Sequence, residues 1–294
     1  MNFSEIQINA ASESAAIGIQ KHIPKIDLFA KSFSGRAGTP YNGIALPIFS
    51  NVSGVNKYEN LLTTGNSSLY GDKYCPGEAL EGTVIQLDKL YTKSYALTDF
   101  EVGSTDKLYL ADGARAMAEQ ISLEIANQIF TSVLSASDAT ISATTPTTTA
   151  GFAGLFAAAA NAGANPYDCV VALDAPTFST LLGKLDSYVY GGAEAVRDGV
   201  VPGLYGFRGV VVAPSLPTGV NGFIIPWESI GIVNRYNKPA VDGYEATFSS
   251  TDPHTGFTIG YRVYEDRCKG LAIMAADCLW GAKLIAPNKI VRLV

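Results

Sequence analysis

The sequence predicts an α+β fold, and three features carry that prediction. Apolar residues recur at intervals of three and four between positions 105 and 134, which is the period of an amphipathic helix. The last part of the chain, from 257 to 294, is a succession of segments rich in strand-forming residues. Ahead of both lies a stretch, 33–80, so rich in Gly, Ser, Asn, Tyr and Pro that it breaks any long helix.

The first 32 residues are predicted to form an arm rather than a core element, because their isoleucines, from Ile17 to Ile23, are followed at once by Pro24. The stretch 33–80 keeps only short strand-like runs such as Ile44–Phe49. Loops of this length inside a compact domain are uncommon and are usually functional or disordered. Strand-forming residues then return at Thr83–Leu87, Lys89–Thr92 and Tyr95–Thr98.

The next element is the most clearly predicted one, a helix from 105 to 134. Ser104 or Thr105 can cap it, and Asp106 stands in its first turn. At 1.5 Å per residue it would be about 45 Å long. Its predicted apolar stripe consists of Leu110, Ala114, Met117, Ile121, Ile125, Ile129 and Val133.

Residues 135–149 are rich in Ser, Thr and Ala and are interpreted as a linker or exposed loop. An Ala-rich helix, Phe152–Ala162, and the strand Cys169–Leu173 follow. Asp174 is placed to cap a helix that starts at Pro176. Three more strands, Val210–Ala213, Phe223–Pro226 and Ile230–Val233, complete a small α/β unit. The remaining strands are expected at Phe257–Tyr264, Leu271–Met274, Ala282–Ile285 and Ile290–Val294.

Charged residues make up 16% of the chain, against about 25% in ordinary soluble domains. The uncharged surface that this leaves suits permanent contacts with other subunits, and equally a compact monomeric enzyme. The net charge of −6 argues against a protein that wraps nucleic acid through a broad basic face. Basic residues near the two ends are expected to be ordinary solvated charges. They are Lys21, Lys25, Lys31 and Arg36, and Lys283, Lys289 and Arg292.

The four cysteines, Cys75, Cys169, Cys268 and Cys278, include no C-x-x-C pair and are expected to be reduced and mostly buried. The N-terminus has no basic region followed by an apolar run, so no signal peptide is expected. The longest apolar stretch, Phe152–Ala160, is too short to span a bilayer. We therefore expect a soluble protein that stays inside the cell that makes it.

No catalytic constellation is visible, and we expect no catalytic residue, no cofactor site and no metal site. Of the two histidines, His22 falls in the arm and His254 in the turn Asp252–Gly256. There is no G-x-S-x-G elbow and no G-x-x-x-x-G-K-[ST] loop, and the glycines at 203, 206 and 209 lack the dinucleotide-binding spacing. Tyrosines in loop-like segments fit either a surface buried against a partner or plain loop positions. They are Tyr41, Tyr58, Tyr70, Tyr74, Tyr188 and Tyr190.

Three segments, in this order and spacing, resemble the tailed-bacteriophage major capsid proteins of the Hong Kong ninety-seven fold, which encapsulins share. Ala172–Phe178 looks like the family's strand-to-helix turn in the axial domain. Pro202–Val212 looks like its segment of a glycine followed by a strand, and Asp252–Arg262 like its late turn and strand. The resemblance covers essentially the whole chain.

The resemblance implies a capsid-type fold with an N-terminal arm, an extended β-loop, a peripheral domain built on a spine helix, and an axial α/β domain. The arm would be 1–32, the loop 33–82, the peripheral domain 83–150 with 241–294, the spine helix 105–134 and the axial domain 151–240.

The resemblance also implies a structural protein and not an enzyme. Such a subunit self-assembles into the pentamers and hexamers of an icosahedral phage head, the virion shell around double-stranded DNA, and is made in the host bacterial cytoplasm. The implied partners are further copies of the chain, a portal protein at one vertex, and DNA contacted without sequence specificity. A separate scaffolding protein is also expected, because arm and loop account for the residues ahead of the first peripheral-domain strand.

Two alternatives stay open. An encapsulin-like compartment shell for protein cargo has nearly the same sequence pattern, whereas a soluble α/β enzyme is disfavoured by the shortage of histidine. Some family members join a loop lysine to an asparagine of a neighbour. Lys57 and Lys73 lie in the corresponding region, but residue type alone does not support a cross-link, and none is expected.

Overall fold

The computed structural model describes residues 5–34, 43–47, 82–98, 109–136, 140–142, 146–184, 200–236, 244, 246–253, 255–266 and 268–294. The chain divides into two compact units, one made of residues 45–84 and the other of the rest. Strands β2 (Gly43–Pro47) and β3 (Gly82–Gln86) form a two-stranded sheet. β2 confirms the start of the strand predicted at 44–49. The rest of the predicted loop, 35–42 and 48–81, lies outside the described residues, and with it Lys57, Lys73, Cys75, Tyr41, Tyr58, Tyr70 and Tyr74. Tyr188 and Tyr190 also lie outside the described residues.

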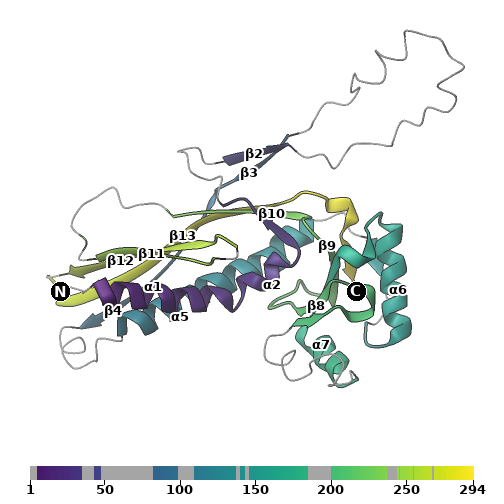
Figure 1. Cartoon of the computed structure of the whole chain (residues 1–294), viewed down its shortest axis with the longest axis horizontal. Helices are drawn as coiled ribbons and strands as arrows, with labels where there is room; N and C mark the ends of the chain where they lie inside the picture. Colours follow the sequence, from purple (N-terminus) through teal and green to yellow (C-terminus); the bar gives the residue numbers. More distant parts are fainter. Residues whose placement is uncertain are drawn as a thin grey trace, which may run out of the picture. The chain divides into compact units, whose positions relative to one another are not determined.

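A six-stranded sheet forms one layer of the larger unit (Figure 1). Its strands are β1 (Ala30–Ser32), β10 (Ile230–Arg235), β13 (Leu271–Leu284), β12 (Thr258–Asp266), β11 (Ala246–Thr251) and β4 (Lys89–Thr98). Along one edge, β13 pairs with β4 through residues 271–280. Along its other edge, β13 pairs first with β12 and then with β10, so these two strands lie end to end.

Buried and half-buried residues alternate without a break along β13 from Leu271 to Trp280. Met274, Ala276, Cys278 and Trp280 all point into the core from the same face. The two short strands predicted at 271–274 and 282–285 are therefore parts of one strand. The small residues between them hid the alternation, because Ala275 and Gly281 carry little hydrophobic signal.

The buried side chain of Asn234 joins β10 to β12 where the two strands meet. Its amide nitrogen donates to the carbonyl oxygen of Thr258 at 3.0 Å and to the sulfur of Cys278 at 2.9 Å. Its amide oxygen accepts from the backbone N–H of Thr258 at 2.6 Å. A polar group this deeply buried is tolerated because its hydrogen bonds are made, and these bonds span the gap between the two strand ends.

Helices cover the inner face of this sheet (Figure 1). They are α1 (Glu5–Gln20), α2 (Ile23–Asp27) and α5 (Tyr109–Gln128), the last continued by a π-helical turn, Ile129–Val133, and a 3-10 turn, Leu134–Ala136. The predicted helix 105–134 is thus confirmed over its described part; its capping residues lie outside that part. All seven residues of the predicted apolar stripe are buried.

Helix α1 is part of the core, so the prediction that residues 1–32 form an arm outside it is wrong for the part that is described. Ala11, Ala15 and Ile19 are fully buried against α5. At Gly18 the helices come so close that a Cβ atom would lie 2.5 Å from the carbonyl oxygen of Arg115. The face of α1 is built from small residues, which permit close packing but carry a weak hydrophobic signal.

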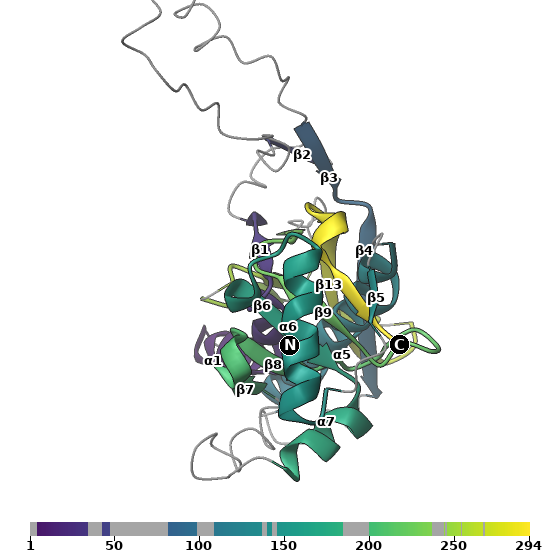
Figure 2. The same ribbon diagram turned by 90° about the vertical axis from the view of Figure 1, so that its right-hand side faces the viewer.

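A second six-stranded sheet has the order β5-β14-β9-β6-β8-β7. Its strands are β5 (Thr140–Ser142), β14 (Val291–Leu293), β9 (Gly222–Pro226), β6 (Cys169–Leu173), β8 (Gly209–Val212) and β7 (Val200–Pro202). Helices α6 (Thr149–Asn161) and α7 (Ala175–Leu182) pack with one face of it, as Figure 2 shows for α6. The other face joins the main core, which explains why every residue of β6 is buried.

The local predictions in this region are largely confirmed. β6 has the predicted bounds, and the carboxylate of Asp174 caps α7 by accepting from the N–H of Thr177 at 3.2 Å. Helix α6 begins at Thr149, ahead of the predicted Phe152, because Thr148 caps it. The segment 135–149 is not simply an exposed loop, since it includes β5 and the buried Pro146 and Thr147.

The two sheets do not follow the predicted ranges at three strands. β10, expected with the axial range 151–240, belongs to the larger sheet because Ile232 pairs with Ala282. β5 and β14, expected with the peripheral ranges 83–150 and 241–294, belong to the second sheet, where Val291 pairs with Ile224. Such pairing is decided by partners far along the chain. The division of the chain into domains at the predicted ranges remains a prediction.

We expect Ile121→Ala and Ile125→Ala each to lower the free energy of unfolding by about 2–5 kcal/mol, through lost burial and the cavity left behind. Gln120→Ala, an exposed position on the same helix, should change it by less than about 0.5 kcal/mol. The neighbouring Glu119 pairs with Lys21 and is a poorer control. Urea unfolding followed by circular dichroism measures all three. Equal losses at both kinds of position would mean that the buried face of α5 is misassigned.

Candidate functional site

The described residues contain no cluster suited to a metal ion, defined as three or more neighbouring His, Cys, Asp or Glu side chains. His22 lies at the start of α2, and His254 is outside the described residues. Gly203 has a left-handed backbone (φ 62°) and precedes a single 3-10 turn, Leu204–Gly206, that leads into strand β8. None of the described helices combines the length and the apolar character needed to cross a membrane.

Three of the basic residues near the chain ends make an ion pair or a hydrogen bond to a residue far along the chain. Lys21 pairs with Glu119, and Lys31 pairs with Glu228 at 2.7 Å. Arg292 donates to the carbonyl oxygen of Ser135 at 3.0 Å. Exposed pairs of this kind contribute little to stability, and they fit the prediction of ordinary surface charge.

The buried thiols are kept protonated by their surroundings. Burial raises the pKa of Cys169 to about 12, with a smaller contribution from Asp168. Burial also raises the pKa of Cys278, against the hydrogen bond from Asn234, which lowers it. Cys268 is exposed, so the prediction of mostly buried thiols holds for two of the three cysteines described.

Two edge strands of the larger sheet, β11 and β4, differ in what covers them. The β11 edge is covered by α1: the hydroxyl of Ser12 donates to the carbonyl oxygen of Ser249 at 2.9 Å, and the hydroxyl of Ser250 donates to the carbonyl oxygen of Ser12 at 2.7 Å. The opposite edge is β4, which among the described residues pairs only with β13. An uncovered edge strand offers a row of backbone donors and acceptors to another chain.

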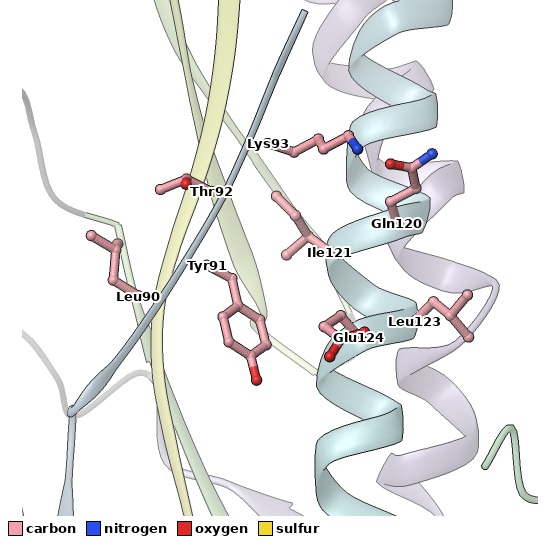
Figure 3. Close-up of a pocket in the computed structure, with 8 residues that line it drawn as sticks. All are labelled: Leu90, Tyr91, Thr92, Lys93, Gln120, Ile121, Leu123 and Glu124. Atoms are coloured by element: carbon pink, nitrogen blue, oxygen red, sulfur yellow. The ribbon is translucent and has the colours of Figure 1, made fainter.

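A groove of about 530 Å³ runs between β4 and α5 (Figure 3). Its lining residues are Leu90, Tyr91, Thr92 and Lys93 from the strand and Gln120, Ile121, Leu123 and Glu124 from the helix. In Figure 3 the Tyr91 ring points from the strand toward Glu124, and Lys93 reaches toward Gln120. Leu90 is 57% exposed, unusually so for a leucine on a regular strand.

The Tyr91 side of the groove is fixed and partly apolar. The Tyr91 ring packs edge-on against the buried Trp280, with ring centroids 5.4 Å apart. Burial raises the pKa of Tyr91, and the charge of Glu124 raises it further, so the phenol stays neutral. A neighbouring tyrosine, Tyr95, lies so close to Gly113 of α5 that any side chain there would overlap its ring. The strand is thus held against the helix while its outer edge stays open.

This arrangement suits the binding of an extended peptide segment better than catalysis. The open edge can extend the sheet through main-chain hydrogen bonds, and the groove can take alternate side chains of the added segment. No local pattern in the sequence indicated this open edge directly, because the strand was predicted without its neighbours. The apolar Leu90 directly beside Tyr91 on the predicted strand was the available signal.

The outer face of the same sheet carries a half-buried ion pair. Arg262 donates to Asp277 at 2.8 Å, and its guanidinium carbon lies 5.9 Å from the centroid of the Tyr244 ring. Burial raises the pKa of Asp277, and the charge of Arg262 opposes that rise. We interpret this pair as structural, since it ties β12 to β13.

No protein-family model matches the sequence, and neither does any curated protein. Solved structures do share the fold. A virus-like particle from Pyrococcus furiosus matches over 99% of this chain and 100% of its own, with a TM-score of 0.58 and 11% identity. The capsid of an empty GTA particle matches over 90% of this chain and 87% of its own, with a TM-score of 0.56 and 10% identity. The capsid of the cyanophage P-SCSP1u matches over 92% and 86%, with a TM-score of 0.50 and 16% identity.

We expect a thiol reagent to modify Cys268 rapidly in the native protein and to leave Cys169 and Cys278 untouched until it unfolds. At about pH 8 the two buried groups remain thiols, because their pKa values lie well above their usual range, and only a thiolate reacts. A Cys75→Ser background removes the fourth cysteine, and Cys268→Ser should abolish the fast reaction. Mass spectrometry counts the labels, and rapid labelling of a second thiol would contradict the burial described.

Proposed function

We propose that this chain, which has the Hong Kong ninety-seven fold, is the major capsid subunit of a tailed bacteriophage. In this proposal, copies of the chain assemble into the pentamers and hexamers of an icosahedral head around double-stranded DNA. The observation that carries the proposal is the match of the fold, over nine tenths of the chain or more, with the capsids of a cyanophage and a GTA particle. We propose no enzymatic activity.

The open β4 edge and its groove are the proposed contact for a neighbouring subunit. The outer part of the predicted extended loop, residues 51–72, has few large apolar residues with which to form a core of its own. Lying across the next subunit, it would find backbone partners at the β4 edge and a place for side chains between β4 and α5. The low charged fraction of the chain, 16%, suits a surface that is largely covered by other copies.

The remaining partners follow from the same proposal. A separate scaffolding protein would guide assembly, a portal protein would occupy one vertex, and the DNA would be contacted without sequence specificity. A net charge of −6 fits a container that holds DNA without binding it tightly. The mature subunit would then reside in the virion shell after synthesis in the host bacterial cytoplasm.

The second candidate is an encapsulin-like compartment that encloses protein cargo. It is supported by the match with the virus-like particle from Pyrococcus furiosus, which covers essentially the whole of both chains. The contents of native particles distinguish the two. Packaged double-stranded DNA favours the phage head, and a co-purifying cargo protein with no DNA favours the compartment.

Replacing residues 51–72 by a short Gly/Ser linker should abolish closed shells and leave a folded subunit. Shortening a loop changes its closure entropy by only about a kcal/mol, whereas the subunit would lose its reach across its neighbour. Circular dichroism and thermal melting report the fold, while sedimentation and negative-stain imaging report assembly.

A matched pair of point variants tests the receiving side of the same contact. Leu90→Asp places a charge on the exposed face of β4 (Figure 3) and should block assembly, and Ile17→Asp, at a similarly exposed apolar residue of α1, should not. For the variant in which a linker replaces residues 51–72, normal shells would show that the loop does not hold neighbouring subunits together. An unfolded product would show instead that the loop belongs to the core of the subunit.

A further inference from the structure

Three exposed aromatic rings gather at one end of the second sheet, where β6 and β8 begin and β9 ends. Tyr167 is 66% exposed, Trp227 48% and Tyr205 37%. The backbone connects them closely: the N–H of Trp227 donates to the carbonyl oxygen of Asp168 at 2.9 Å. Gly206, next to Tyr205, lies so close to the Tyr167 ring that a Cβ atom there would be 3.4 Å from it. We call these three rings, with Arg208, the aromatic end.

Each ring is held in place although it faces solvent. The Tyr167 ring packs edge-on against Phe156, with centroids 5.3 Å apart. The Tyr205 ring lies 4.7 Å from that of Phe152. The Arg208 guanidinium stacks over the Trp227 ring at 4.8 Å. Rings that are already ordered lose little freedom when a partner covers them, which is the property of an interface anchor.

The backbone at the aromatic end is also unusual. Among the described residues, two that are not glycine have a left-handed conformation: Tyr205 (φ 50°) and Glu228 (φ 58°). One is itself a member of the aromatic end, and the other follows Trp227 directly. Residues held in this region of backbone space cluster at functional sites, because the surrounding structure must enforce them.

We propose that the aromatic end is a contact surface for a second copy of this chain, an inference that rests on the proposed shell-building function. Trp, Tyr and Arg are the residue types that dominate binding energy at protein interfaces. Both charge signs are present, in the exposed Arg208 and the exposed Asp168, so two copies can place opposite charges against each other.

The exposed area also indicates the kind of contact. An aromatic side chain has roughly 150–250 Å² to bury, so three half-exposed rings supply only on the order of 300 Å². A stable pair of proteins needs about 800 Å² from each partner. The contact is therefore too small to hold a dimer in solution, and it becomes significant when it is repeated around a closed assembly. Nucleic acid is a poorer fit, since Arg208 is the one cation in the aromatic end.

Tryptophan fluorescence can report on this surface, because the chain has two tryptophans and the other one, Trp280, is fully buried. Subtracting the emission of Trp227→Phe from that of the wild type isolates the signal of Trp227. Acrylamide quenching of this signal is measured on nucleic-acid-free subunits and on shells assembled from them. We expect the quenching constant to fall several-fold on assembly, with a shift of the emission to shorter wavelength.

A pair of variants adds an independent readout. Trp227→Ser should reduce the yield of shells, and Ile17→Ser, at a residue of nearly equal exposure on α1, should leave it unchanged. Unchanged quenching in closed shells overturns this contact and leaves the proposed function standing. Quenching that falls only when nucleic acid is added also overturns it. A wild type that remains a monomer at every concentration overturns both proposals.

Discussion

The larger sheet depends on the alternation of a single strand, β13. Its inner face, from Met274 to Trp280, is buried against the helices, so neither a change of register nor a break is possible without exposing core residues. Its two edges organise the other strands, with β4 on one side and β12 and β10 end to end on the other. The hydrogen bonds of Asn234 make that second edge continuous, although it is built from two strands separated in sequence.

This arrangement leaves the edge strands β11 and β4 in different surroundings. Helix α1 covers the β11 margin through hydrogen bonds of Ser12, while the β4 margin stays open beside the groove on α5. In a monomer, an open edge with an exposed Leu90 is an aggregation hazard. In an assembly, the same edge is a place for a neighbour, and the aromatic end of the second sheet offers another. Both surfaces are consistent with a subunit whose open edge and exposed rings are covered by other copies in a shell.

Local signals in the sequence predicted local structure well. The stripe of α5, the bounds of β6 and the cap at Asp174 each depend on residues within a few positions of one another. The failures concern contacts over long distances or weak signals. The small-residue face of α1 carries little hydrophobicity, and β10 joins the larger sheet through a partner strand that no local pattern reveals. The open edge and the aromatic end exist only once strands distant in sequence lie side by side.

Hydrogen–deuterium exchange on free subunits and on assembled shells tests most directly whether β4 is an edge kept open for a neighbour. Among the amides of Lys89–Thr98, those turned away from β13 should exchange rapidly in the subunit and become protected in the shell. The amides of β11, Ala246–Thr251, that face β12 should be equally protected in both states, because they are already paired within the sheet. Rapid exchange of β4 amides in closed shells would contradict the account, since the edge would then remain unpaired after assembly.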